Sequence, residues 1–261
     1  MKILVTVTEV ADADDEFEIS GTSIEERYLT FDLNEWDDYA IEEAVQLGEE
    51  HDDIEVVTAT VGPERTEETI RTGLAKGADR AVRIWDDSLE GETILDPSLK
   101  AELLAGVVEE EEPDLVLSGV QSGDVSIGAT GVALAEQVGF EWAAVVNELD
   151  LNRDEGVASV HRELEGGVEE LTDVDIPAVL TIQTGINEPR YASLRGIRQA
   201  QSKPLDVKTP EDLGVELEES PLSLTKLVEP ESESDTELFE GSAEDTAGKL
   251  AELLREKGVG A

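Results

Sequence analysis

The sequence contains no cysteine, so disulfides and cysteine-ligated zinc or iron–sulfur sites are excluded. No apolar run approaches the roughly 20 residues that span a bilayer. Positive charge is scarce, with 19 Lys and Arg residues against 64 Asp and Glu, a formal net charge of −45. Without a basic stripe to neutralise phosphates, nucleic-acid binding is not expected. We therefore predict a soluble cytoplasmic protein that binds no nucleic acid and does not insert into a membrane.

The large negative charge has two interpretations. A disordered acidic chain would lack apolar periodicity, but this sequence is 39% hydrophobic and has apolar segments such as Ile3–Val5 and Leu115–Leu117. A folded protein with a dense carboxylate surface tolerates its self-repulsion where salt screens it, because the Debye length falls to about 3 Å at 1 M. We therefore predict a folded protein from a halophilic cell.

The first two hundred residues alternate apolar strand-like segments with amphipathic segments, which predicts α/β class with a parallel sheet covered by helices on both faces. Strands are expected at residues 2–8, 55–60, 80–84, 115–117, 143–147, 157–163 and 178–181. Helices are expected at residues 35–50, from Thr66 to Gly77, from Pro97 to before Pro113, at 126–137 and at 243–257. Residues 9–33 form a polar, acidic excursion to which no helix or strand is assigned, and residues 187–204 are expected to be irregular.

The strand that ends near Leu117 opens into a glycine-rich loop, with Gly119, Gly123, Gly128 and Gly131 around the start of a helix. Ligands of open parallel sheets bind beyond the carboxyl ends of strands. Glycines allow backbone amides to approach a phosphate, and a helix N-terminus stabilises its charge. The pattern has no P-loop lysine, so the loop is either a phosphate site or a tight turn with close packing.

Four of the 19 basic residues lie between positions 190 and 203, namely Arg190, Arg195, Arg198 and Lys203. They could pair with carboxylates and relieve local repulsion, or they could form a docking surface for a partner. Conventional catalytic sets are missing: the two histidines are far apart in sequence, and acid pairs in this composition are most simply hydrated surface. We expect no catalytic residues and no metal site.

Several segments resemble, in the right order, the beta subunits of electron transfer flavoproteins. They are residues 34–44, 71–80, 162–167, 212–214 and, most specifically, Asn187-Glu188-Pro189-Arg190-Tyr191-Ala192-Ser193-Leu194-Arg195-Gly196-Ile197-Arg198. The resemblance covers residues 1 to about 214. It implies a Rossmann-like domain, of the adenine-nucleotide alpha-hydrolase-like type, at 1–204 with a partner-docking loop at 187–204. A C-terminal arm at 205–261 would contact the alpha subunit.

The resemblance also implies a function. Such a subunit forms a heterodimer with an alpha subunit that holds the working FAD, and it buries an adenine nucleotide, usually AMP. It carries electrons without a catalytic set of its own. Electrons arrive from flavin dehydrogenases such as acyl-CoA dehydrogenases and leave to a membrane quinone oxidoreductase.

Family nucleotide contacts carry over to Thr6, Asn34, Asp37, Val61, Gly119, Gln121, Ser122, Asp124, Ser126, Gly128, Ala129 and Thr130. Glu163 matches a glutamate near the flavin at the subunit boundary. Leu194 matches a leucine that anchors the partner dehydrogenase, and the adjacent Arg195 and Arg198 would form a charged rim.

Two alternatives stay open. AMP-binding members share Asp124, Thr130 and Gly131 with this chain, whereas electron-bifurcating relatives, which hold a second FAD here, share only Asp124 and Gly131. Ala13 stands where some members have a flavin-contacting tyrosine. AMP is therefore favoured over a second FAD in a bifurcating or nitrogen-fixation-type subunit. A nucleotide-sensing regulatory domain without electron transfer is the other alternative, and the 187–198 segment argues against it.

Overall fold

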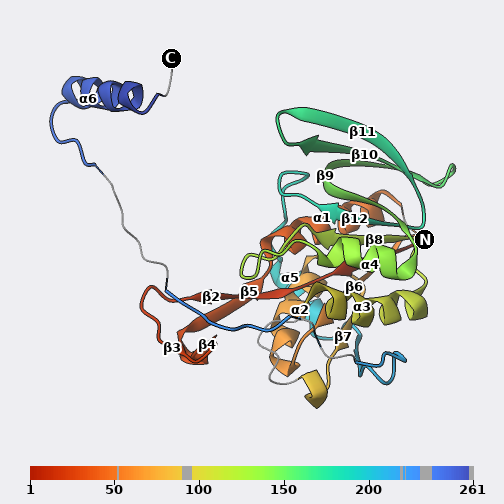
Figure 1. Ribbon diagram of the computed structural model, residues 1–261. Coiled ribbons are helices and arrows are strands. Elements are labelled where there is room, and N and C mark those ends of the chain that lie inside the picture. The colour runs from red at the N-terminus through yellow and green to blue at the C-terminus, as the bar shows by residue number, and fades with distance from the viewer. Residues whose placement is uncertain (52, 90–95, 218–219, 221, 230–236, 259–261) are drawn as a thin grey trace. The chain divides into compact units, whose positions relative to one another are not determined.

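The computed structural model describes residues 1–51, 53–89, 96–217, 220, 222–229 and 237–258 (Figure 1). It divides into two compact units, Met1–Leu227 and Val228–Ala261. The first unit contains a nine-stranded sheet among its described residues, in the order β11-β10-β9-β12-β8-β1-β6-β7-β13. The α/β fold with a mostly parallel sheet matches the fold class predicted from the sequence.

The sheet has a parallel core and an antiparallel edge. The parallel strands are β1 (Lys2–Thr6), β6 (Glu55–Val61), β7 (Arg80–Ile84), β8 (Leu115–Gly119), β12 (Ala178–Ile182) and β13 (Leu205–Lys208). β9 (Glu141–Asn152) runs parallel to β12, and β10 (Val157–Leu164) pairs antiparallel with both β9 and β11 (Val168–Asp175). The carboxyl ends of β1, β6 and β8 therefore meet at one edge of the sheet.

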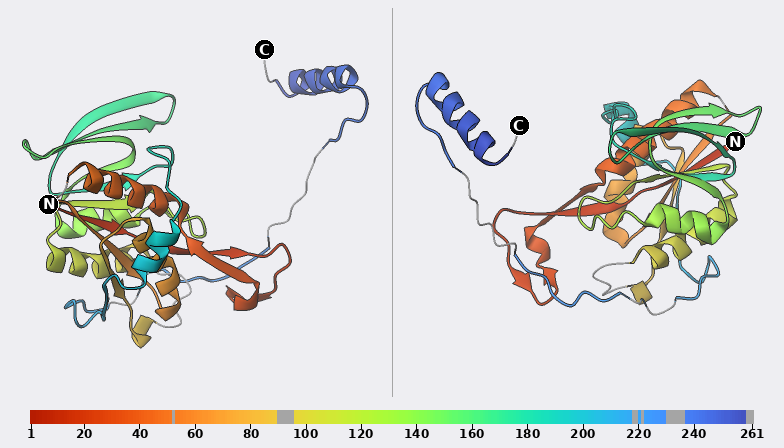
Figure 2. Two further views of the ribbon diagram at one scale, coloured as in Figure 1. Left: turned by 180° about the vertical axis from the view of Figure 1, so that it is seen from behind. Right: turned by 45° about the horizontal axis from the view of Figure 1, so that its top comes forward.

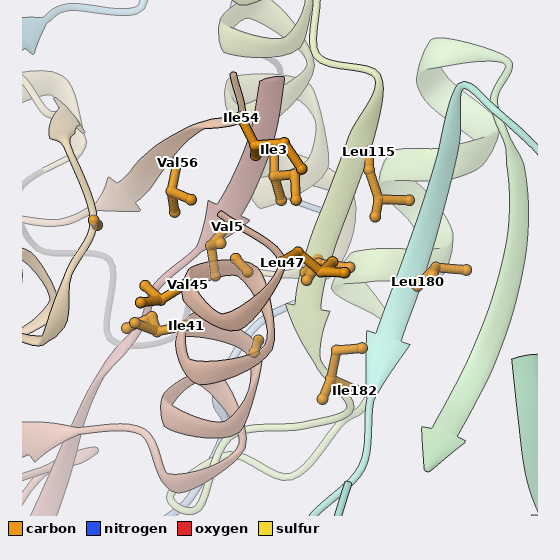
Figure 3. Close-up of a cluster of buried hydrophobic side chains, with 14 of the residues drawn as sticks. Ile3, Val5, Ile41, Val45, Leu47, Ile54, Val56, Leu115, Leu180 and Ile182 are labelled. Atoms are coloured by element: carbon orange, nitrogen blue, oxygen red, sulfur yellow. The ribbon is translucent and has the colours of Figure 1, made fainter. Parts of the chain in front are cut away.

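Helices cover both faces because successive residues of a strand point to opposite sides. From β1, Ile3 and Val5 pack into the cluster that contains residues of α1 (Glu35–Glu50), α2 (Glu67–Lys76) and α5 (Leu194–Ala200). Figure 3 shows Val5 near Val45 and Ile41 of α1, and Ile3 next to Ile54. From the same strand, Leu4 packs into the opposite cluster with residues of α3 (Pro97–Glu111) and α4 (Thr130–Val138). All three β1 side chains are fully buried, and burying each such side chain stabilises the fold by roughly 1.5–3 kcal/mol.

Two helix starts differ in how well the sequence predicted them. α3 begins at Pro97 as expected, and Asp96 caps it because its side chain accepts a hydrogen bond of 2.9 Å from the Leu99 amide. The helix expected from residue 126 begins only at Thr130. Ser126 and Gly128 adopt left-handed φ angles of 55° and 66°, which interrupt a helix before that point.

Residues 9–33, the polar and acidic excursion in which no element was predicted, contain strands. They include β2 (Glu9–Ala13) paired antiparallel with β5 (Leu29–Leu33), and a short hairpin of β3 (Ile19–Ser20) and β4 (Ser23–Ile24). Figure 2 shows the β2–β5 pair as a red ribbon that leaves the main sheet in both views. Acidic residues at many of its positions obscure the alternation by which strands are recognised.

Three further elements were not predicted. α5 lies within residues 187–204, β11 follows β10, and β13 pairs with β7 at the edge of the sheet. The first compact unit extends to Leu227, and the functional division at residue 204 stays a prediction. The role of residues 205–261 in contacting an alpha subunit stays a prediction.

In the second unit, α6 (Ala243–Glu256) occupies almost the range expected for the last helix. Ser242 caps it by accepting a hydrogen bond of 3.2 Å from the Asp245 amide. None of its residues is buried. Across both units, the described helices include none with the length and apolar character needed to cross a membrane.

Candidate functional site

A pocket lies at the carboxyl ends of β1, β6 and β8, where ligands of open parallel sheets bind. It is bounded by the exits of these strands, the start of α1, one face of α3 and the loop between β8 and α4. Its described lining residues are Thr6, Val7, Thr8, Asn34, Asp37, Ala59, Val61, Pro97, Lys100, Leu104, Ser118, Gly119, Val120, Gln121, Ser122, Val125, Ile127, Gly128, Ala129 and Thr130.

Asp37 connects three of these segments. Its carboxylate accepts hydrogen bonds from the Thr8 amide at 2.7 Å and the Gly119 amide at 2.9 Å. Burial raises the pKa of Asp37 to about 6, although hydrogen bonds from Thr8, Asn34 and Gly119 counteract this. Only glycine fits at position 119, since a Cβ there would lie 2.4 Å from Asp37 Oδ1. The buried carboxylate therefore fixes where β1 and β8 leave the sheet.

Asn34 holds the loop that follows β8. Although it precedes the first residue of α1, its side chain does not cap that helix. Instead its Nδ2 donates to the Gln121 carbonyl at 2.9 Å, and its Oδ1 accepts from the Gly123 amide at 3.2 Å. Both functional groups of a buried amide are thus satisfied by the loop backbone, which fixes the first half of that loop.

The second half of the loop leads into the N-terminus of α4. Ser126 donates through its amide and its hydroxyl to the Ser122 carbonyl, at 3.0 and 3.1 Å. Gly128 turns the chain with its positive φ, and Ala129 and Thr130 then line the pocket at the start of the helix. Ala129, at the N-cap, provides no side-chain cap. The first-turn N–H groups of α4 can therefore serve an anion.

The structure brings most of the predicted nucleotide contacts together. Thr6, Asn34, Asp37, Val61, Gly119, Gln121, Ser122, Gly128, Ala129 and Thr130 all line this one pocket. Asp124 and Ser126 belong to the same loop without lining the pocket, and Asp124 accepts a hydrogen bond of 3.3 Å from the Ala11 amide. Glu163 lies on β10 in a separate hollow with Val145, Asn147 and Gln183.

The sequence analysis missed Lys100, which is the one positively charged side chain among the described lining residues. It also missed Pro97 and Leu104, which come from the same helix. The three recur at helical spacing, which was available in the sequence. That this face of α3 reaches the exits of β1 and β8, however, depends on the tertiary arrangement.

Residues 187–204, here called the docking segment, begin with a loop held firmly on α1. The Arg190 guanidinium donates to Glu42 at 2.8 and 3.0 Å and to Glu49 at 2.6 and 3.0 Å. Asn187 donates through Nδ2 to the Tyr39 carbonyl and to a carboxylate of α1. Burial raises the pKa of Glu42, but the hydrogen bonds from Arg190 outweigh it and hold that pKa below its usual value.

Beyond this loop the docking segment exposes apolar side chains. Leu194 is 79% exposed and Tyr191 is 97% exposed. Ser193 caps α5 by accepting a hydrogen bond of 3.0 Å from the Gly196 amide, which starts the helix at Leu194. The leucine named from the sequence is therefore presented to solvent at a fixed helix terminus.

The basic cluster of the docking segment divides into two pairs. Arg190 is paired with carboxylates, and Lys203 donates to the carbonyls of Leu74 and Ala78 at 3.0 and 2.6 Å. Within the part of the chain that the structure describes, the side chains of Arg195 and Arg198 make no hydrogen bond or ion pair, and both residues are exposed. Of the four basic residues in this cluster, Arg195 and Arg198 are therefore the two available to a partner.

The described residues contain few other groupings of side chains that could bind a metal or react. No three His, Cys, Asp or Glu side chains in the described ranges converge as metal ligands. His161 lies on β10, 3.8 Å from Glu148 and 3.7 Å from Glu169. These two acids are both exposed, so the group resembles surface pairing more than a reactive set.

Comparison with known proteins shows similarity to the electron transfer flavoproteins. The electron transfer flavoprotein domain matches residues 22–213 of this chain. The chain is 42% identical to the electron transfer flavoprotein subunit beta of Methylophilus methylotrophus, over 98% of each protein. It is 35% identical to the human electron transfer flavoprotein subunit beta over 98% of each protein. It is also 35% identical to the mitochondrial subunit beta of Arabidopsis thaliana over 88% of this chain and 90% of the relative.

Proposed function

Because the chain belongs to the electron transfer flavoprotein family and is similar to its beta subunits along nearly its whole length, we propose that it is the beta half of a heterodimeric electron carrier. In this proposal an alpha subunit holds the working FAD, and this chain supplies an adenine-nucleotide site and a docking surface. The chain takes part in electron transfer as a carrier subunit and has no catalytic residues of its own. The donors are flavin dehydrogenases, such as acyl-CoA dehydrogenases, and the acceptor is a membrane quinone oxidoreductase.

The observation that carries the nucleotide assignment is the convergence on one pocket. Ten residues named from the sequence as nucleotide contacts line it, although they come from four separate regions of the chain. The loop from Gly119 to Thr130 offers backbone N–H groups and a helix N-terminus to a phosphate. We propose AMP as the ligand, since Thr130 is shared with AMP-binding members and lines the pocket.

The docking assignment is carried by the contrast within the docking segment. The first loop of the segment is fixed to α1 by Arg190, whereas the side chains of Tyr191 and Leu194 are exposed. A transient partner needs a small apolar anchor, because a large apolar patch would slow release and promote aggregation. Arg195 and Arg198 would orient an acidic partner. Glu163 would lie near the flavin of the alpha subunit.

The net charge of −45 supports a further part of the proposal, that the heterodimer works in a salt-rich cytoplasm. Molar salt shortens the range of carboxylate repulsion to about 3 Å. Under those conditions long-range steering by the two arginines is weak, so the apolar anchor carries most of the docking preference. Experiments on this chain therefore belong in molar KCl.

Gly128→Leu tests the nucleotide site. The φ of Gly128 is +66°, and a Cβ there would lie 3.3 Å from the Val120 carbonyl oxygen, so leucine should distort the loop. We expect the purified variant to lose its nucleotide and, with it, the stabilisation that a bound ligand gives the folded state. The measurement is the amount of adenine nucleotide released per chain on denaturation.

Gly123→Leu is the matched control in the same loop. A Cβ at Gly123 meets nothing within 4 Å and its φ is not in the left-handed region, so this variant should keep its nucleotide. If Gly128→Leu retains a stoichiometric nucleotide, the phosphate does not lie on this loop. If both variants lose it equally, the loss does not come from the constrained backbone at Gly128.

A further inference from the structure

Lys100 occupies an unusual position in so acidic a chain. Pro97, Lys100 and Leu104 form the face of α3 that borders the pocket. Among the described lining residues, Lys100 has the only full positive charge. Its ammonium group makes no hydrogen bond or ion pair with any residue in the described ranges, whereas Lys2, Lys76 and Lys208 each pair with a carboxylate.

The surroundings of Lys100 make its unpaired ammonium group energetically unfavourable. Burial lowers the pKa of Lys100, and the negative charges of Asp124 and Asp37 only partly offset that effect. The Asp37 carboxylate is already engaged by two backbone amides, and Asp124 accepts from the Ala11 amide. A desolvated ammonium without a direct partner is unfavourable unless a ligand completes its hydrogen bonds.

A phosphate in this pocket needs such a cation. A phosphate monoester carries nearly two negative charges at neutral pH, while a helix N-terminus supplies only about half a positive charge. The carboxylates of Asp37, which lines the pocket, and of Asp124, in the loop beside it, would repel the phosphate. Backbone amides of the β8–α4 loop could orient the phosphate oxygens, but among the lining residues described only Lys100 can balance their charge.

We propose that Lys100 neutralises the phosphate of the bound nucleotide and thereby makes the pocket select an adenosine phosphate over the uncharged nucleoside. The inference rests on the nucleotide site proposed above and adds the residue that sets its charge selectivity. Because Lys100 is partly buried at the pocket, molar salt screens this contact less than it screens an exposed ion pair.

The test compares AMP with adenosine as probes of the full chain in molar KCl, after its own nucleotide has been dialysed away. Lys100→Met keeps the length of the side chain and removes its charge. We expect it to raise the Kd of AMP about 10- to 100-fold, the range of a charge-assisted hydrogen bond. The Kd of adenosine should change less than about threefold, because no charged contact is lost.

Two variants sharpen the result. Lys208→Met removes one lysine charge from a surface pair with Glu110 outside the pocket, so it should change neither Kd. Lys100→Arg restores the charge and should recover most of the AMP preference. If Lys100→Met does not fold, Lys100→Gln provides the same comparison.

The outcomes separate this inference from the proposed function. If the wild-type chain binds AMP but Lys100→Met weakens AMP and adenosine equally, or weakens neither, then Lys100 does not act on the phosphate and the nucleotide site stands. If the wild-type chain binds no adenine nucleotide at all, the proposed site fails and this inference fails with it.

Discussion

The pocket and the docking segment use scarce positive charge in opposite ways. In the docking segment, the Arg190 guanidinium donates four hydrogen bonds to the carboxylates of Glu42 and Glu49. In the pocket, the Lys100 ammonium meets no such partner within the described residues. A cation that carboxylates have saturated positions the backbone, whereas a cation kept apart from them is available to a ligand. In this chain the environment of a basic residue therefore tells more about its role than its charge does.

The two regions also place apolar and polar groups differently. Around the pocket, Asp37 and Asn34 are buried and their polar atoms are satisfied by backbone of the β1 and β8 exits. On the docking segment, Leu194 is exposed, and the preceding loop is held on α1 by the ion pair of Arg190 with the buried Glu42. A preorganised polar cavity suits a small, permanently held ligand, while an apolar anchor on a rigid base suits a partner that binds and leaves.

The largest effect is expected from breaking the base of the docking segment. Arg190→Met would leave Glu42, whose side chain is only 6% exposed, without its cation. Removing one partner of a buried pair costs about 3–5 kcal/mol, and partial exposure of Arg190 should reduce this to about 2–3 kcal/mol. The measurement is the free energy of unfolding by denaturant at pH 7 and constant KCl.

Glu49→Gln tests whether the burial of Glu42 is the reason for the loss of stability in Arg190→Met. Glu49 contacts the same arginine, but its side chain is 62% exposed. An exposed pair contributes little, so this variant should lose less than about 1 kcal/mol. Equal losses for Arg190→Met and Glu49→Gln would mean that the clamp on Glu42 is not what holds the segment.

The pocket should respond to pH through Asp37, with an effect of about 2 kcal/mol. The pKa of its carboxyl is raised from 3.8 to about 6 by burial, so between these values the folded state binds more protons than the unfolded state. The contribution of Asp37 to stability is therefore full below pH 4 and is lost as the pH rises through 6. Relative to Asp37→Asn, which cannot titrate, the wild type should lose about 2 kcal/mol between pH 4 and 7.

The measurement is the difference in unfolding free energy between wild type and Asp37→Asn at several pH values. Glu35→Gln, at an exposed position in the same first turn of α1, is the control for removal of a carboxylate. A difference that stays constant with pH for Asp37→Asn would show that this carboxyl is not buried as described.

Leu194→Ala should have the smallest effect on stability and a selective effect on electron delivery. Its side chain is 79% exposed, so the unfolding free energy should change by less than about 0.5 kcal/mol. Loss of an apolar anchor at an interface should lower flavin reduction by a cognate dehydrogenase about tenfold. Reduction by dithionite, which needs no docking, should be unchanged.

Val207→Ala on β13 is the matched control, since this apolar side chain is 50% exposed outside the docking segment. It should leave both rates unchanged. A normal dehydrogenase rate for Leu194→Ala would remove this residue from the docking surface. A loss with both donors would instead indicate damage to the flavin site.

The sequence predicted the parts of the fold whose signals are local. The range of α1 agrees with its prediction at both ends, because its apolar residues recur at helical spacing. The start of α3 is marked by Asp96 and Pro97, whose capping and first-turn roles need no tertiary information. The family resemblance identified nucleotide-contact residues at the ends of several strands, and the parallel topology brings these strand ends together around one pocket.

What the sequence did not predict depends on packing between distant segments. β13 is an edge strand that forms by pairing with β7, more than a hundred residues earlier. Lys100 resembles any surface lysine of an amphipathic helix until α3 is placed beside the exits of β1 and β8. Arg190 was grouped with Arg195 and Arg198 by sequence proximity, although its carboxylate partners lie on α1.

The most direct test of the central claim is the identity of the ligands in the native complex. The chain would be co-expressed with an alpha subunit, purified in molar KCl, denatured, and its released nucleotides quantified by mass spectrometry. The account predicts one FAD and one AMP per heterodimer. Two FAD molecules without AMP would contradict the AMP assignment, and a chain that neither pairs with a flavin-bearing subunit nor releases an adenine nucleotide would contradict the account as a whole.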